Sequence, residues 1–206
     1  MERTMFYGTG AAEGIPDPFC TCYLCQYARD HGGKDVRTRS MFRVDPTMVI
    51  DMGADAYTQA NRYGGLTRLQ DVLITHTHED HFCFMMMNVW NMATHRNVPC
   101  LNYYFVEKGY EIVEVMRDNP AFIKGNLQRM EQKGILRCHQ LRFFETYSIG
   151  GKQVTPLKGH HWGNMDDQCA NFLIKMPNGT TLYYGSDTGR YESETLEYLK
   201  HVKIDV

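Results

Sequence analysis

Three histidines and two carboxylates occur within residues 76–81, directly after an apolar run, Val72-Leu73-Ile74. The run predicts a short buried strand, so the polar side chains lie where that strand ends. Alternate side chains of an extended chain share a face, which places His76 and His78 on one side before the chain bends. The fold must therefore open onto a polar site at this strand end. A solvated loop whose histidines contact only water and backbone is the alternative interpretation.

The spacing of these side chains, His-x-His-x-Asp-His, favours metal binding. Imidazole nitrogen and carboxylate oxygen both suit zinc, manganese and iron. The pairs His76/His78 and Asp80/His81 could serve two neighbouring metal ions. The helical motif His-Glu-x-x-His of zinc proteases does not fit, because His78 and His81 are three residues apart instead of four.

Composition excludes several classes of function. A chain of 206 residues predicts one domain, residues 1–206, with 43% hydrophobic and 22% charged residues. A formal net charge of −2 leaves no basic surplus for a phosphate backbone, so general nucleic-acid binding is not expected. No segment approaches the roughly 18 to 20 apolar residues of a membrane span, and the N-terminus lacks a signal-peptide core. We therefore expect a cytoplasmic protein with no membrane partner.

Strands and helices are predicted in both halves of the chain. Strands are expected at 4–7, 40–44, 47–51, 72–75, 101–105, 140–144, 152–157, 171–175, 181–184 and from 201 onward. Helices are expected at 54–63, 82–93, 108–117 and 192–199, the second of them buried. Strands from both halves with helices between them suggest a two-sheet α/β sandwich.

The motif at residues 76–81, with its context, resembles the hallmark of the metallo-β-lactamase superfamily of hydrolases. Val49–Gly53 resembles the strand end that precedes this hallmark. Thr155–His161 resembles the strand that supplies the next metal-binding histidine, and Tyr183–Gly189 the strand end that supplies a bridging carboxylate. The resemblance covers most of the chain. It implies a four-layer αββα sandwich.

The resemblance also implies the ligands of two divalent ions, zinc or manganese or else iron. The first ion would be held by His76, His78 and a histidine that follows Gly159. His161 has the spacing found in the relatives of this motif, six residues after Thr155, and His160 is the alternative.

The second ion would take Asp80 and His81, with Asp187 bridging the two ions. Asp80 and Asp187 would also act in catalysis by orienting metal and water. Asp51 would lie behind the ligands and orient one of them. Its alternative role is that of a carboxylate in a strand-end turn.

Cys20, Cys22 and Cys25 place three thiols within six residues, which favours a structural zinc with a fourth ligand from elsewhere. A Cys-x-x-Cys redox motif at 22–25 is the alternative, but no thioredoxin-like βαβ context surrounds it. In the cytoplasm disulfides are not expected. Scattered in apolar settings, the remaining cysteines are expected in the core: Cys83, Cys100, Cys138 and Cys169.

The glycine loop 8–14 followed by the three cysteines resembles a narrower branch of the superfamily. This branch contains the phosphoribosyl cyclic phosphodiesterase and the pyrroloquinoline-quinone accessory protein. The loop does not fit a dinucleotide site, because the third glycine of Gly-x-Gly-x-x-Gly would fall at Glu13. Superfamily members supply a last metal-binding histidine after one more strand. We therefore expect a chain shortened at its C-terminus, without the last strand and helix, that self-associates as a homo-oligomer.

These features predict a metal-dependent hydrolase. The resemblance implies a phosphodiesterase that acts on a small cyclic or sugar phosphodiester through a metal-bound hydroxide. Hydrolysis of another ester, a lactam or RNA on the same scaffold remains an alternative. A second alternative is a non-catalytic metal-binding accessory protein of the same fold. A third is a thiol-redox protein that uses Cys22 and Cys25.

Overall fold

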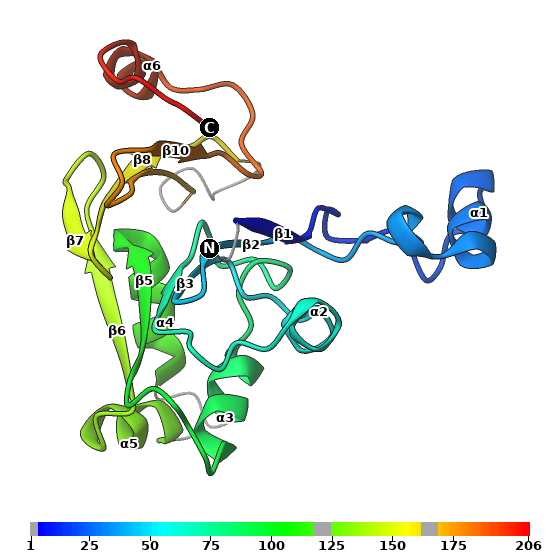
Figure 1. Ribbon diagram of the computed structural model, residues 1–206, viewed down its shortest axis with the longest axis horizontal. Coiled ribbons are helices and arrows are strands. Elements are labelled where there is room, and N and C mark those ends of the chain that lie inside the picture. Colours follow the sequence, from blue (N-terminus) through cyan, green and yellow to red (C-terminus); the bar gives the residue numbers. More distant parts are fainter. Residues whose placement is uncertain (1–3, 118–124, 162–168) are drawn as a thin grey trace.

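Two β-sheets pack face to face in the computed structural model, which describes residues 4–117, 125–161 and 169–206 (Figure 1). The first sheet has the order β1 (Met5–Gly8), β2 (Met41–Asp45), β3 (Met48–Ile50), β4 (Asp71–Leu73), β5 (Leu101–Val106) and β6 (Leu136–Leu141). The second has the order β10 (Thr181–Tyr184), β9 (Ala170–Lys175), β8 (Lys152–Lys158) and β7 (Tyr147–Ile149). From β3 to β6 the pairing is parallel, whereas the second sheet is antiparallel.

Helices cover the outer faces of both sheets. On the first sheet lie α2 (Ala56–Tyr63), α3 (Phe84–Met92), α4 (Glu107–Arg117) and α5 (Asn126–Gln132), and α6 (Ser193–Lys200) packs on the second. Figure 1 shows these layers from α6 at the top to α3 and α5 at the bottom. The layer order confirms the predicted αββα sandwich. None of the described helices is long and apolar enough to cross a membrane.

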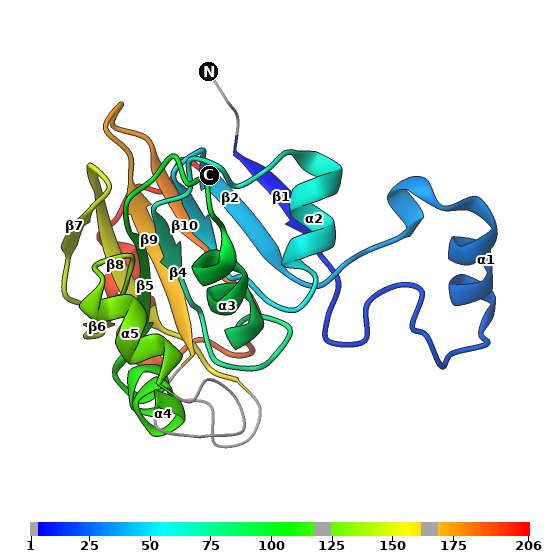
Figure 2. The same ribbon diagram turned by 90° about the horizontal axis from the view of Figure 1, so that it is seen from below.

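The core explains why β4 is a continuous apolar run. Val72 packs among the helices of the first sheet, together with Tyr103 and Phe105. The next residue, Leu73, points the other way and packs against Phe172 of the second sheet. A strand with both faces buried needs apolar residues at every position, and Figure 2 shows β4 lying within the stack.

The edge where the parallel strands end carries the segment 75–81. The backbone N–H of Ala170 donates to the carbonyl of Thr75 (2.8 Å), which joins the two sheets at this edge. After its turn the segment returns to β3, because the N–H of Met52 donates to the carbonyl of His81 (2.7 Å). A Cβ on Gly53 would collide with the carbonyl oxygen of Asp80, so this close approach requires glycine.

Several sequence-based expectations need correction. The helix expected at 82–93 is α3, but among its described side chains only Met87 is buried, because a single face meets the sheet. The strand expected at 140–144 is instead β6, whose register follows from its parallel pairing with β5. The segment from His201 forms no named strand, although Asp205 and Val206 donate backbone hydrogen bonds to the carbonyl of Thr181 at the edge of β10. Two helices and one strand were not predicted: α1 (Tyr23–His31), α5 and β7.

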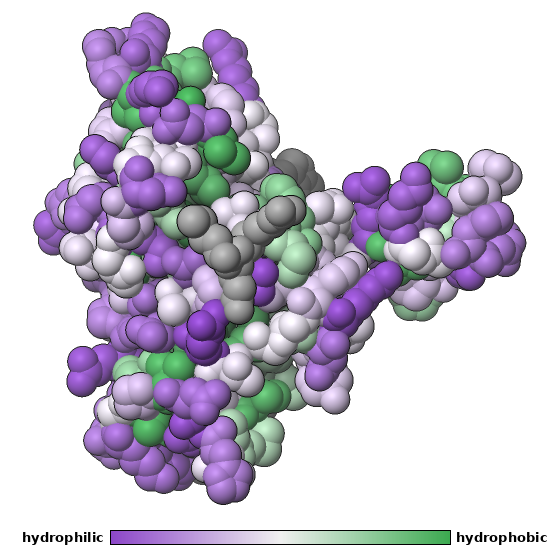
Figure 3. All heavy atoms as spheres, in the orientation of Figure 1, coloured by the Kyte–Doolittle hydropathy of each residue, from purple (hydrophilic) through white to green (hydrophobic). Residues whose placement is uncertain are grey.

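The part of the chain that contains α1 projects from the body as an arm, which also includes the short 3-10 helix η1 (Gly33–Asp35) (Figure 1). Isolated β-bridges join Gly10 to Arg39 and Ile15 to Arg37 at the base of the arm. Phe19, which belongs to the arm, is 94% exposed. Figure 3 shows apolar side chains, coloured green, on the surface of the arm. The arm holds the three clustered cysteines.

Candidate metal centre

Nitrogen atoms of three histidines converge at the edge between the sheets. Nε2 of His76 lies 3.0 Å from Nδ1 of His78, and Nε2 of His161 lies 3.2 Å from the same atom. One ligand-type atom from each of the three lies within 4.8 Å of those of the other two. The structure therefore brings together the three residues predicted to hold the first ion.

A second group adjoins the first. Nε2 of His81 lies 3.2 Å from Oδ2 of Asp187 and 3.3 Å from Oδ2 of Asp80. His76, His81 and Asp187 again place ligand-type atoms within 4.8 Å of one another. All six predicted ligands thus lie together, and we call them the histidine–aspartate cluster: His76, His78, Asp80, His81, His161 and Asp187. His76 belongs to both groups.

His160, the alternative to His161, is directed elsewhere. Its Nδ1 lies 3.4 Å from Oε1 of Glu192, outside the cluster. The adjacent His161 turns toward His78 instead. The choice between two neighbouring histidines depends on where β8 ends, at Lys158.

Asp51 lies behind the cluster and is fully buried. Its carboxylate accepts a hydrogen bond from Nδ1 of His81 (2.7 Å) and another from the backbone N–H of Thr75 (2.9 Å). Because Nδ1 carries the hydrogen of His81, its Nε2 is the nitrogen that faces Asp80 and Asp187. This contact corresponds to the ligand-orienting role that the resemblance implied.

Thr75 is a functional residue that the sequence reasoning missed. Its buried hydroxyl donates to Asp51 (2.9 Å) and lies 3.1 Å from Nδ1 of His76, from which it can accept. The second contact leaves Nε2 of His76 facing His78, just as Asp51 leaves Nε2 of His81 facing the carboxylates. A threonine at the end of a strand buried on both faces was the available signal, since a buried hydroxyl needs a partner.

The electrostatics of the cluster fit a cation. Burial, assisted by the neighbouring histidines, lowers the pKa of His76 to about 2, so its imidazole is neutral and has a free lone pair. For His81 burial acts in the same direction, but the charge of Asp51 and hydrogen bonds to three carboxylates outweigh it and raise the pKa to about 12. Burial raises the pKa of Asp80, yet His81 lowers it to about 2. The neutral imidazole of His76 and the ionised carboxylates suit divalent zinc, manganese or iron, and His81 would join them as a ligand by giving up its Nε2 proton when the ion binds.

Two carboxylates of the site have strained backbones. Asp51 has φ = 63° and Asp187 has φ = 48°, both in the left-handed region that residues other than glycine rarely adopt. Such conformations persist where the surrounding contacts hold them, and they are frequent at functional sites.

The three arm cysteines form a separate group. The Sγ atoms of Cys20, Cys22 and Cys25 lie within 4.8 Å of one another, and within the described part of the chain the group consists of these three residues. Hydrogen bonds from the backbone of Cys25 and from the thiols of Cys20 and Cys25 lower the pKa of Cys22 to about 7. Three thiols this close together fit a zinc ion. All seven cysteines are free thiols.

Comparison with known proteins identifies the family. A model described as a beta-lactamase superfamily domain matches residues 47–206. The chain belongs to the beta-lactamase superfamily. This assignment confirms the resemblance drawn from residues 76–81.

Solved structures with the same fold include Zn²⁺-bound PqqB from Methylobacterium extorquens, with a TM-score of 0.69, 18% identity and coverage of 95% of this chain and 68% of that one. A diphosphatase of the PhnP family gives a TM-score of 0.69, 19% identity and coverage of 95% and 69%. Human tRNase Z, short form, gives a TM-score of 0.56 at 15% identity, and the match covers 90% of this chain and 70% of that one. The fold of the predicted branch is thereby confirmed.

A curated relative matches a shorter part of the chain. An octanoyltransferase from Porphyromonas gingivalis is 33% identical over 81 residues, which make up 38% of this chain and 16% of that protein. The match therefore spans about a sixth of the length of this relative.

Proposed function

We propose that the protein is a metal-dependent hydrolase of phosphodiesters, acting on a small cyclic or sugar phosphodiester. The observation that carries the proposal is the convergence of imidazole nitrogens and carboxylate oxygens within 4.8 Å at one edge of the sandwich. The fold likeness to a PhnP-family diphosphatase and to tRNase Z supports the choice of phosphodiesters.

His76, His78 and His161 would hold one divalent ion, and Asp80, His81 and Asp187 would hold a second. Bound divalent ions lower the pKa of water and neutralise charge on the attacking and leaving oxygens. Thr75 and Asp51 fix the ring orientations of His76 and His81, so their Nε2 atoms point into the site before anything binds.

The two catalytic carboxylates differ in their access to solvent. The side chain of Asp80 is 8% exposed and is held against His81, which suits a ligand. The side chain of Asp187 is 31% exposed. Asp187 is therefore the better placed of the two to accept a proton from a water molecule that enters the site.

The test is hydrolysis of bis(p-nitrophenyl) phosphate and of cyclic diesters by the metal-loaded protein. We expect turnover that His76→Ala abolishes together with bound metal. The variant Lys200→Ala, which changes an exposed lysine on α6, should keep both. A metal-loaded protein without activity on any linear or cyclic diester would contradict the proposal. Metal binding without turnover would favour the non-catalytic accessory protein.

One observation favours a second candidate, a hydrolase of acyl esters or thioesters. A cavity of about 490 Å³ adjoins segment 75–81 at Thr77 and Glu79. Most of its remaining lining is apolar and comes from the residues just before α3, from α3 itself and from α4: Phe82, Cys83, Phe84, Met85, Asn88, Ile112 and Met116. Such a cavity suits an aliphatic chain, and an octanoyltransferase is among the relatives. Faster hydrolysis of p-nitrophenyl octanoate than of any phosphodiester would establish this candidate in place of the first.

A further inference from the structure

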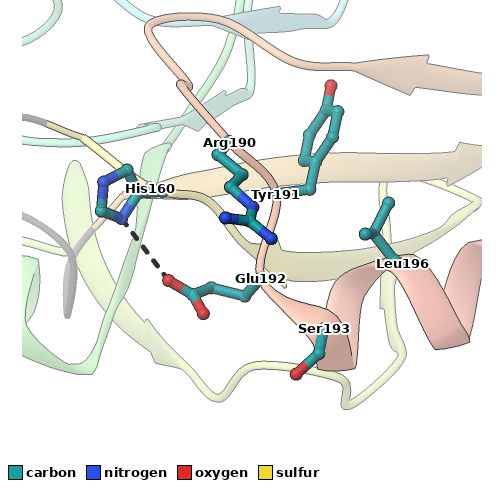
Figure 4. A pocket seen from close by; sticks show the side chains of 6 residues that line it. All are labelled: His160, Arg190, Tyr191, Glu192, Ser193 and Leu196. Carbon is teal, nitrogen blue, oxygen red and sulfur yellow. Dashed lines mark ion pairs between the residues drawn. The ribbon is translucent and has the colours of Figure 1, made fainter.

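A hollow of about 380 Å³ opens beside the histidine–aspartate cluster, at the start of α6 (Figure 4). His160 on its wall directly precedes the predicted ligand His161, and Arg190 follows Asp187 by three residues. Two segments that supply the cluster therefore also form the hollow. The complete lining is His160, Arg190, Tyr191, Glu192, Ser193 and Leu196.

Contacts between these two segments hold the walls of the hollow together. The backbone N–H of Gly189 donates to the carbonyl of His160 (2.6 Å), and the backbone N–H of His160 donates to the hydroxyl of Thr188 (3.2 Å). The backbone that carries Arg190 is thus positioned before any ligand arrives.

Arg190 carries the positive charge that faces the hollow. Its side chain is exposed, and within residues 4–117, 125–161 and 169–206 it makes no ion pair or hydrogen bond. Figure 4 shows its guanidinium extending over the hollow, while the carboxylate of Glu192 is turned toward His160. Glu192, the acidic side chain of the hollow, therefore contacts His160 and not Arg190.

This arrangement suits an anion. A guanidinium presents parallel N–H groups that match the oxygens of a phosphate or a carboxylate. The hydroxyl of Ser193 lies on the same lining as a further donor, and Tyr191 and Leu196 provide the less polar wall.

We propose that Arg190 binds a second anionic group of the substrate, a phosphate or carboxylate distinct from the diester that is cleaved. This inference rests on the proposed function and narrows it. The substrate class becomes a phosphodiester that carries an additional negative charge close to the scissile bond. Arg190 is then a specificity-determining residue and takes no part in the reaction at phosphorus.

Binding of inorganic phosphate to the protein stripped of metal tests the site apart from catalysis, with circular dichroism verifying that the stripped chain keeps its fold. Calorimetry should show that Arg190→Gln weakens binding about 3- to 10-fold, the loss of one charge-assisted pair at an exposed site. Glu192→Gln should strengthen it, because a negative charge is removed from the hollow. Lys200→Gln is the matched control and should leave it unchanged, since Lys200 is an exposed cation paired with Glu197 on α6.

Two synthetic diesters test the same residue in the metal-loaded protein: p-nitrophenyl ethyl phosphate and p-nitrophenyl carboxymethyl phosphate. They share the scissile bond and differ by one carboxylate, and a 2-phosphoethyl analogue tests phosphate in its place. The parent should prefer the charged diesters about 3- to 10-fold in kcat/KM, and Arg190→Gln should abolish the preference while hydrolysing the ethyl diester as before.

The inference is overturned if Arg190→Gln binds phosphate as tightly as the parent and keeps the same preference for charged diesters. It is also overturned if Lys200→Gln weakens phosphate binding as much as Arg190→Gln does. Failure of the proposed function gives a different result. No diester would then be hydrolysed by any variant, whereas phosphate binding would still depend on Arg190.

Discussion

Asp51→Asn is the substitution that separates the orientation of a ligand from ligation itself. The change keeps the shape of the side chain and alters one atom. The new amide can still accept from the backbone N–H of Thr75 through its oxygen. Its NH₂ group, however, then faces Nδ1 of His81 across 2.7 Å, where two donors oppose each other.

His81 can relieve this conflict only by moving its hydrogen to Nε2, the nitrogen that lies 3.2 Å from Asp187. That nitrogen can then no longer donate its lone pair to a metal ion. Loss of such a supporting contact weakens metal affinity about 10- to 100-fold, which corresponds to about 1.4 to 2.8 kcal/mol. The fully buried position of Asp51 places the expected effect in this range, because no solvent can substitute for the lost acceptor.

The assay is metal content per chain after dialysis against a series of competing chelator concentrations. Glu79→Gln is the matched control: it removes one negative charge from the same segment, but its side chain is exposed and is not a predicted ligand. We expect Asp51→Asn to lose metal at a lower chelator concentration, and Glu79→Gln to resemble the parent. Equal metal affinity in all three proteins would refute the role assigned to Asp51.

Lys152→Ala removes a 97% buried partner that lies 2.6 Å from Asp45 and should lower the free energy of unfolding by about 1 to 3 kcal/mol in urea. Burial raises the pKa of Asp45, but the hydrogen bond from Lys152 lowers it below its ordinary value. The stability contributed by this ion pair is therefore present above about pH 4 and is lost as the pH falls through the folded-state pKa of Asp45. Urea titrations at pH 7 and pH 3 would show this loss. Gly53→Ala should displace segment 75–81 and reduce both the melting temperature and the metal content, and an unchanged melt would contradict the close packing described. Cys22→Ala and His76→Ala should each lose a different share of the bound metal in elemental analysis, since their groups are separate; identical losses would argue against two sites.

The local parts of the fold were predictable because short-range patterns determine them. β4 follows from an apolar run, and β10 matches the expected 181–184. The cluster was predictable for the same reason, since four of its six members stand within residues 76–81. The motif itself, together with the resemblance it supports, led to His161 and Asp187.

Long-range features were harder to predict. Whether His160 or His161 faces the cluster depends on how β8 pairs with β9, which no local pattern determines. β6 lies at the edge of its sheet and alternates poorly, so its start was misplaced. The helix α1 projects from the body and buries only Cys25 and Ala28, so packing against the core contributes little to it. Thr75 was missed because its importance comes from Asp51, 24 residues away.

The cluster takes its members from both halves of the sandwich. His76, His78 and His81 follow β4 in the first sheet, whereas His161 follows β8 and Asp187 follows β10 in the second. A metal ion bound there would act as a cross-link that closes loops of 83 residues between His78 and His161 and 106 residues between His81 and Asp187. Closure of such long loops restricts the unfolded chain, and metal affinity then becomes folding stability. Ions that serve the proposed hydrolysis would thus also hold the two sheets together, and a chelator would then destabilise the sandwich as well as stop turnover.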